Sequence, residues 1–251
     1  MARFPLVLCL LASMASAQAP KGSDAATTKA LKLHHAIFTI DTHCDTPMAL
    51  GRGYKMGERH DTGATGSGCQ DFPRMKEGGL DASCFAIFAG QGPLTEEGRA
   101  KAKERALRTF DHLDQMFKEL GPQCERALTV ADLRRIPGTG KRAILVAMEN
   151  GYPIGTDVAN VDLFYQRGAR MIGLVHGLDN DLCDSATDAK DPLDRGLSEV
   201  GAKAVRRMNE LGIVVDVSHA SVKSFFEVLK VSTAPILASH SSSQALSDHA
   251  R

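Results

Sequence analysis

The chain has 251 residues, of which 43% are hydrophobic, and its 30 lysine and arginine side chains balance 30 aspartate and glutamate side chains. A chain of this length can bury a sizeable core, and balanced charge without a basic block argues against nucleic-acid binding. Beyond the N-terminal segment, no apolar run is long enough for a transmembrane helix.

The first seventeen residues have the composition of a secretory signal peptide. Arg3 precedes an apolar run over residues 4–11, and the small residues 15–17 follow. We therefore expect cleavage after Ala17 and a secreted or periplasmic protein. Its single domain would span residues 18–251.

The cysteines identify neither a disulfide framework nor a thiolate metal site. Removal of residues 1–17 would leave an odd number of cysteines without a C-x-x-C pair, so at most two bridges could form and the sequence does not pair them. Cys44 lies between two polar residues on a predicted strand end, and we expect its thiol to pack on the opposite face. The cysteines are Cys44, Cys69, Cys84, Cys124 and Cys183.

Regular structure is predicted to begin with a strand over residues 36–41, shortly before His43 and Asp45. Side chains two positions apart on an extended strand point to the same face, so this pair can form half of a metal site. The alternative is a turn, because Asp-Thr-Pro is an ordinary loop sequence. The glycine-rich residues 51–80 then predict an insertion, and a second strand follows over residues 82–88.

The middle of the chain predicts a long amphipathic helix over residues 96–120, which ends at Gly121-Pro122. The sequence GTGKRA over residues 138–143 is interpreted as a turn, because it lacks the Ser or Thr of a phosphate loop and precedes a strand. That strand is predicted over residues 142–148. The buried stripe of the long helix is expected to contain Ala102, Ala106, Phe110, Leu113, Phe117 and Leu120.

The last third of the chain continues the alternation of strands and helices. Three strands are expected, over residues 169–175, 212–217 and 235–239. A helix over residues 198–211 has Ser198 as its N-cap. A further helix begins at Ser221 and is expected to bury Phe225, Phe226 and Leu229. Such alternation is typical of parallel βα units, in an α/β barrel or a doubly wound sheet.

Metal-competent or proton-transfer side chains follow five of the six predicted strands. After His43 and Asp45 these are, in chain order, Glu149, His176, His219 and His240. Active sites of barrels are built at the C-terminal ends of strands, and these donors exceed what one tetrahedral zinc needs. We therefore expect two metal ions bridged by Glu149, a pair that can hold a hydroxide and hydrolyse a carbonyl substrate. Asp216 is a candidate for a buried residue that orients one of the metal ligands without binding the metal itself.

Several sequence blocks resemble the membrane (renal) dipeptidase family of zinc peptidases. The resemblance extends from about residue 36 to Arg251 and is most specific in the last two blocks. The blocks are IDTHCDTP, FPRMKEGGLDASCFAIF, AMENGYPIG, MIGLVHGLDNDLCDS, GLSEVGAKAVRRMNELGIVVDVSHAS and PILASHSSSQALSDHAR.

This resemblance implies a (β/α)8 TIM barrel of the metal-dependent hydrolase type and an exported dipeptidase that binds two Zn²⁺ ions. His43 and Asp45 would bind one zinc ion, and His219 and His240 would bind the second. Glu149 would bridge the two ions. Dipeptides are the implied substrates, and a homodimer is possible although the sequence does not show one.

The resemblance also implies roles for His176 and Arg251. His176 matches the active-site histidine that contacts the substrate and the tetrahedral intermediate, and Arg251 falls on the clamp for the substrate carboxylate. Family members continue past this block to an aspartate that interacts with the catalytic water. We therefore expect residues 18–251 to form a barrel that lacks about the last two βα units.

Two other interpretations stay open. An amidohydrolase-type barrel, such as a deaminase or a lactamase, usually begins with a His-x-His pair, whereas this chain has His43-x-Asp45. The second interpretation is an inactive, metal-binding fragment, because a sheet of six strands leaves two unpaired edges. On that ground we expect residues 18–251 alone to have little peptidase activity and to aggregate.

Overall fold

The structure is a computed structural model that describes residues 24–61, 70–188, 195–243, 245–246 and 249. The described residues fall into two units, one ending at Phe38 and one beginning at Thr39. In the first unit, helix α1 (Ala25–His34) begins after Asp24, whose side chain accepts a hydrogen bond from the backbone N–H of Thr27. The predicted signal peptide lies outside the described residues.

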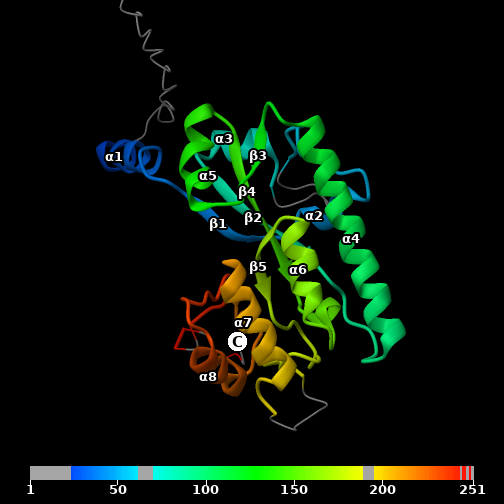
Figure 1. Cartoon of the computed structure of the whole chain (residues 1–251). Coiled ribbons are helices and arrows are strands. Elements are labelled where there is room, and N and C mark those ends of the chain that lie inside the picture. The colour runs from blue at the N-terminus through cyan, green and yellow to red at the C-terminus, as the bar shows by residue number, and fades with distance from the viewer. Residues whose placement is uncertain (1–23, 62–69, 189–194, 244, 247–248, 250–251) are drawn as a thin grey trace, which may run out of the picture. The chain divides into compact units, whose positions relative to one another are not determined.

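The second unit contains a six-stranded parallel sheet with the order β1-β2-β4-β5-β6, and β3 pairs with β4 beside this path (Figure 1). The order follows the chain without the reversal that marks a doubly wound sheet. The fold is therefore a parallel α/β half-barrel. The strands are β1 (Ile40–Cys44), β2 (Ala82–Phe88), β3 (Cys124–Arg126), β4 (Arg142–Glu149), β5 (Ala169–Gly173) and β6 (Val214–Asp216).

Five of the six predicted strands are confirmed; β2 has its predicted limits, and the other four have shifted ends. The first lies later than predicted, so that His43 belongs to β1 and does not follow it. The predicted strand over residues 235–239 was wrong as a strand, because it forms only a bridge between Leu237 and Asp216. Strand β3 was not predicted, since its sequence Cys-Glu-Arg has no apolar, β-branched run.

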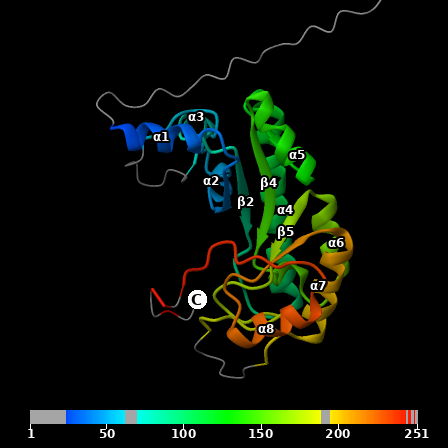
Figure 2. The ribbon, with the colours of Figure 1, turned by 90° about the vertical axis from the view of Figure 1, so that its left-hand side faces the viewer.

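Helices accompany the strands, and Figure 2 shows α4, α6 and α7 beside β4 and β5. The predicted buried stripe of α4 is confirmed as far as Leu113, but Met116 is buried beyond it, while Phe117 and Leu120 are only partly buried. No helix among the described residues is long and apolar enough to cross a membrane. The helices are α2 (Pro47–Leu50), α3 (Phe72–Glu77), α4 (Glu96–Glu119), α5 (Val130–Arg135), α6 (Ala159–Gln166), α7 (Glu199–Leu211) and α8 (Val222–Val231).

Two predictions about helices need correction. Part of the segment interpreted as a glycine-rich insertion is helix α3, which begins after Asp71, whose carboxylate accepts a hydrogen bond from the N–H of Arg74. In α8, Phe226 and Leu229 are 55% and 46% exposed, contrary to prediction. The hydroxyl of Ser224 instead donates to the carbonyl of Asp184, which turns another face of α8 inward.

The two faces of the sheet differ in their packing. Side chains of one face join the helices in the main core, and Cys44 packs there as expected. The other face carries a small cluster of Cys84, Ala147 and Met171. Successive residues of a strand alternate between faces, so Glu149 continues the row of Ala147. The face of the sheet that carries this small cluster is therefore the face on which Glu149 lies at its strand end. No disulfide joins the described cysteines, which are buried, and Cys69 lies outside the described residues.

Helix α7 approaches the loop after β5 closely at Gly201. A Cβ atom on Gly201 would overlap the carbonyl oxygen of Leu182 and lie 2.7 Å from Cδ1 of Leu197. We therefore expect Gly201→Ala to lower the free energy of unfolding by about 1–3 kcal/mol through overpacking. Urea denaturation measures this. The matched control is Gly138→Ala, where a Cβ atom meets nothing within 4 Å; equal stabilities of the two variants would contradict the prediction.

Candidate metal centre

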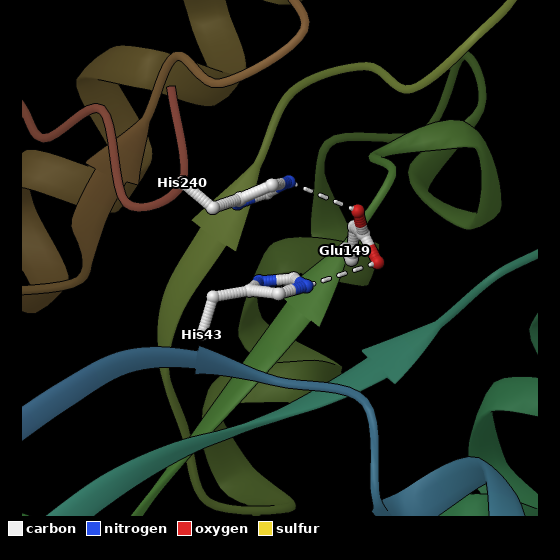
Figure 3. A group of neighbouring side chains, drawn as sticks. All are labelled: His43, Glu149 and His240. Atoms are coloured by element: carbon white, nitrogen blue, oxygen red, sulfur yellow. Dashed lines mark ion pairs between the residues drawn. The ribbon is translucent and has the colours of Figure 1, made fainter. Parts of the chain in front are cut away.

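Four histidine side chains converge on the carboxylate of Glu149, the last residue of β4. Its Oε2 lies 3.6 Å from Nε2 of His43, and Figure 3 shows His240 on the other oxygen. Its Oε1 lies 3.2 Å from Nε2 of His219, 3.3 Å from Nε2 of His240 and 3.6 Å from Nε2 of His176. The two oxygens of one carboxylate thus face different histidines, as a bridging ligand requires.

The structure brings together six of the seven predicted site residues. Asp45 lies at the edge of the cluster, with its Oδ1 3.4 Å from Nε2 of His43 and 48% of its side chain exposed. Arg251 lies outside the described residues. The histidines come from different parts of the sheet. His43 lies on β1, His176 and His219 follow β5 and β6, and His240 lies in the segment that forms a bridge to Asp216 of β6 through Leu237.

Two groups of side chains have ligand atoms that lie within 4.8 Å of one another: His43, Glu149 and His240, and Glu149, His176 and His219. Glu149 belongs to both. This grouping differs from the predicted one, which placed His219 with His240, although their Nε2 atoms are also only 2.8 Å apart. Imidazole nitrogens and carboxylate oxygens are donors that zinc accepts, so the residues present fit a zinc site.

The electrostatics of the cluster favour a charged carboxylate. Burial by itself raises the pKa of Glu149, but the imidazoles of His219 and His240 beside Oε1 and the charges of His43 and His176 hold it well below its usual range. Burial lowers the pKa of His43, yet the hydrogen bond to Asp45 and the charge of Glu149 raise it overall. The centre therefore keeps an anionic ligand among imidazoles at neutral pH.

Backbone conformation at the site is unusual at two positions. Asn150 and His219 have φ values of 75° and 71°, and they are the non-glycine residues with positive φ in the described part of the chain. Both lie at strand ends beside Glu149. Residues held in sparsely populated backbone regions cluster at functional sites, and asparagine tolerates this conformation better than most.

Asn150 joins the loops that carry the site. Its side-chain amide donates to the carbonyl of Ala89, 2.9 Å away, and its oxygen accepts from the N–H of Tyr152 and from the amide of Asn180. Asn180 also accepts from the N–H of Leu182. Neither asparagine was predicted as a site residue, and the only signal in the sequence was the position of Asn150 directly after Glu149.

The loop after β5 is held in place by polar contacts that no sequence pattern predicted. The hydroxyl of Ser185 donates to the carbonyl of His176, 2.6 Å away. Arg99 of α4 forms a bidentate pair with Asp181, with both N–O distances 2.7 Å. The loop thus presents His176 from a fixed position.

Comparisons with known proteins agree with this geometry. The family model for membrane dipeptidase (peptidase family M19) matches residues 27–251. A curated dipeptidase of Claviceps purpurea, tcpJ, is 31% identical over 189 residues, which are 74% of this chain and 44% of that protein. The chain thus spans less than half the length of this curated relative.

Solved structures give the same result. The probable dipeptidase PvdM from Pseudomonas aeruginosa is 33% identical, with a TM-score of 0.78 over 89% of this chain and 57% of that one. A metallopeptidase from Rhodobacter sphaeroides, bound to a phosphinate mimic of the dipeptide L-Ala-D-Ala, is 26% identical, with a TM-score of 0.74 over 86% of this chain and 68% of that one. With the family model matching most of its length, the chain belongs to the membrane dipeptidase family of metallopeptidases.

Proposed function

We propose that this protein is an exported, metal-dependent dipeptidase that hydrolyses the peptide bond of dipeptides with two zinc ions. The observation that carries the proposal is the convergence of four imidazole Nε2 atoms on the two oxygens of Glu149, in a member of the membrane dipeptidase family. The proposed metal ligands are His43, Asp45, Glu149, His219 and His240. Zinc held by these side chains would polarise a substrate carbonyl and lower the pKa of a water molecule.

We assign His176 to the substrate. Its side chain is 36% exposed, whereas those of His43 and His219 are 12% and 6% exposed. Its ring packs edge-on against Phe88, with centroids 4.8 Å apart, which holds it at the rim of the cluster. From there its Nε2–H can donate a hydrogen bond to the oxygen that gains negative charge when the carbonyl is attacked.

Arg251 is proposed to bind the substrate carboxylate, and the support for this role is the C-terminal sequence block. A guanidinium group pairs with a carboxylate through two parallel hydrogen bonds, a geometry that lysine does not provide. A carboxylate held at one distance from the metal centre selects a dipeptide over a longer peptide. The dipeptide mimic bound to the Rhodobacter sphaeroides relative fits this substrate class.

Two further parts of the proposal concern the whole protein. The half-barrel is proposed to be part of a (β/α)8 TIM barrel, since the strand order follows the chain and the matched structures are longer than this chain. Export is proposed from residues 1–17, with a mature N-terminus at residue 18. The N-terminal sequence of the mature protein would check that cleavage site.

Dipeptide hydrolysis should depend on metal and on a free C-terminal carboxylate. In the native protein purified from its source, we expect chelation to abolish cleavage of a dipeptide panel and added zinc to restore it. C-amidated dipeptides and tripeptides should be poor substrates. The same assay on residues 18–251 tests the expectation that this segment alone is nearly inactive. Hydrolysis by the native protein that survives chelation, or equal cleavage of tripeptides, would contradict the proposal.

A further inference from the structure

The segment that carries His240 is fixed by a buried carboxylate beneath the metal centre. Asp216, the last residue of β6, is 4% exposed. Its Oδ1 accepts hydrogen bonds from the backbone N–H groups of Ser218 and Ser239, at 3.0 and 3.1 Å. Its Oδ2 accepts a hydrogen bond from the hydroxyl of Ser239, at 2.5 Å. Both oxygens are therefore used, and they hold the residue that precedes His240.

The hydroxyl of Ser239 also meets the ring of His240, with Oγ and Nδ1 2.8 Å apart. A hydroxyl has one hydrogen, and a carboxylate only accepts hydrogen bonds, so the Ser239 hydrogen points to Asp216. The oxygen then accepts from Nδ1–H of His240. In the neutral ring this leaves Nε2 with the lone pair, and Nε2 is the atom that faces Glu149 at 3.3 Å.

We propose that Asp216 and Ser239 are positioning residues that hold His240 in the Nδ1–H tautomer and aim its Nε2 at the metal centre. This inference rests on the proposed zinc-dependent function, because the tautomer matters for an imidazole that binds a metal. It also gives the expected orienting role of Asp216 a target: the carboxylate acts on His240 through Ser239.

The asparagine variant at position 216 tests the proposal sharply. Two backbone N–H groups fix the position of Oδ1, so the amide of Asp216→Asn must place its NH₂ group where Oδ2 lies. That NH₂ group donates to Ser239, whose own hydrogen then turns toward Nδ1 of His240. The neutral ring would carry its proton on Nε2 and lose its ability to bind zinc there.

Zinc affinity, measured by competition with a chromophoric chelator, is the first readout in the purified chain. We expect Ser239→Ala to weaken binding of the more weakly held ion about 10-fold, and Asp216→Asn to weaken it about 100-fold. Loss of a group that hydrogen-bonds to a metal ligand typically lowers metal affinity by about 10–100-fold. Ser239→Thr keeps the hydroxyl and should restore most of the affinity. Ser242→Ala changes an exposed serine two residues after His240 and should have no effect. Urea denaturation checks that each variant is folded.

The second readout is the tautomer itself, measured by ¹⁵N NMR of histidine side chains in the metal-free chain at a pH where imidazoles are neutral. We expect the proton of His240 on Nδ1 in the unchanged chain and on Nε2 in Asp216→Asn. Unchanged zinc affinity in both Ser239→Ala and Asp216→Asn, or a proton on Nε2 in the unchanged chain, would overturn the inference. Failure of the unchanged chain to bind zinc would instead contradict the proposed function, and the tautomer would still decide the inference.

Discussion

Replacing Glu149 with glutamine is expected to abolish zinc binding and to lower dipeptide hydrolysis by about a thousandfold or more. The variant keeps the size of the side chain but removes its charge and one of the two oxygens that face the histidines. Breaking a buried charge pair costs about 3–5 kcal/mol, and about 4 kcal/mol corresponds to three orders of magnitude in rate. Metal analysis of the purified variant and its kcat/KM measure the two effects.

The matched control for this variant is Glu125→Gln on β3. Glu125 pairs with Arg135 and Lys141 near the surface, where an ion pair contributes about 0–1 kcal/mol. We expect this control to bind zinc and hydrolyse dipeptides as the unchanged protein does. Normal zinc content in Glu149→Gln would contradict the role of Glu149 as the bridging ligand.

The pH dependence of stability gives an independent check on Glu149. Its pKa in the folded state lies below the value of about 4.3 that a glutamate has when unfolded. The carboxylate therefore stabilises the metal-free fold fully above about pH 4.3, and this contribution is lost as the pH falls toward the folded-state pKa. We expect the free energy of unfolding of the metal-free protein to fall more steeply below about pH 4.3 than that of Glu149→Gln.

Asn150→Ala is expected to lower the free energy of unfolding by about 3–5 kcal/mol and to disturb the metal centre. The variant leaves the buried carbonyl of Ala89 and the N–H of Tyr152 without their partner, and each unsatisfied group costs about 1–3 kcal/mol. Alanine also tolerates the φ of 75° less well than asparagine does. Urea denaturation measures the loss.

Asn150→Gly separates the two causes. Glycine loses the same hydrogen bonds but adopts positive φ without a steric penalty, so this variant should be about 1 kcal/mol more stable than Asn150→Ala. Equal stabilities of the alanine and glycine variants would show that backbone conformation contributes nothing at this position. Stability equal to that of the unchanged protein would contradict the role of the hydrogen bonds.

The long, strongly patterned elements were predictable from the sequence. Strand β2 has its predicted limits, and α4 and α7 lie within a residue or two of theirs, since apolar spacing and end signals agree there. Phe226 and Leu229 were misplaced because they are apolar without being buried. Their orientation depends on the hydrogen bond from Ser224 to Asp184, a contact between residues forty positions apart that no local pattern encodes.

The candidate site was predictable in its members but not in its geometry. The C-terminal residues of parallel strands lie at one edge of the sheet, so a histidine or glutamate at each strand end predicts a common site. The pairing of each histidine with one oxygen of Glu149 depends on how the segment around residue 240 returns to β6. That segment has no regular pattern of apolar residues from which its path could be predicted. The tertiary contacts of Asn150 and Ser239 could not be predicted from the sequence for the same reason.

The irregular attachment of His240 has a kinetic consequence. Leu237 exchanges two backbone hydrogen bonds, with Val215 of β6 and with Val217 just after it, and the N–H groups of Ser239 and His240 donate to side chains, those of Asp216 and Ser218, in place of a strand ladder. Glu149, by contrast, ends a ladder that pairs β2 with β4 along its whole length. The return segment can therefore open locally while the sheet stays intact, and its amide hydrogens should exchange with solvent faster than those of β4. Of the convergent histidines, His240 would then be the last to dock during folding and the first to detach when the protein loosens.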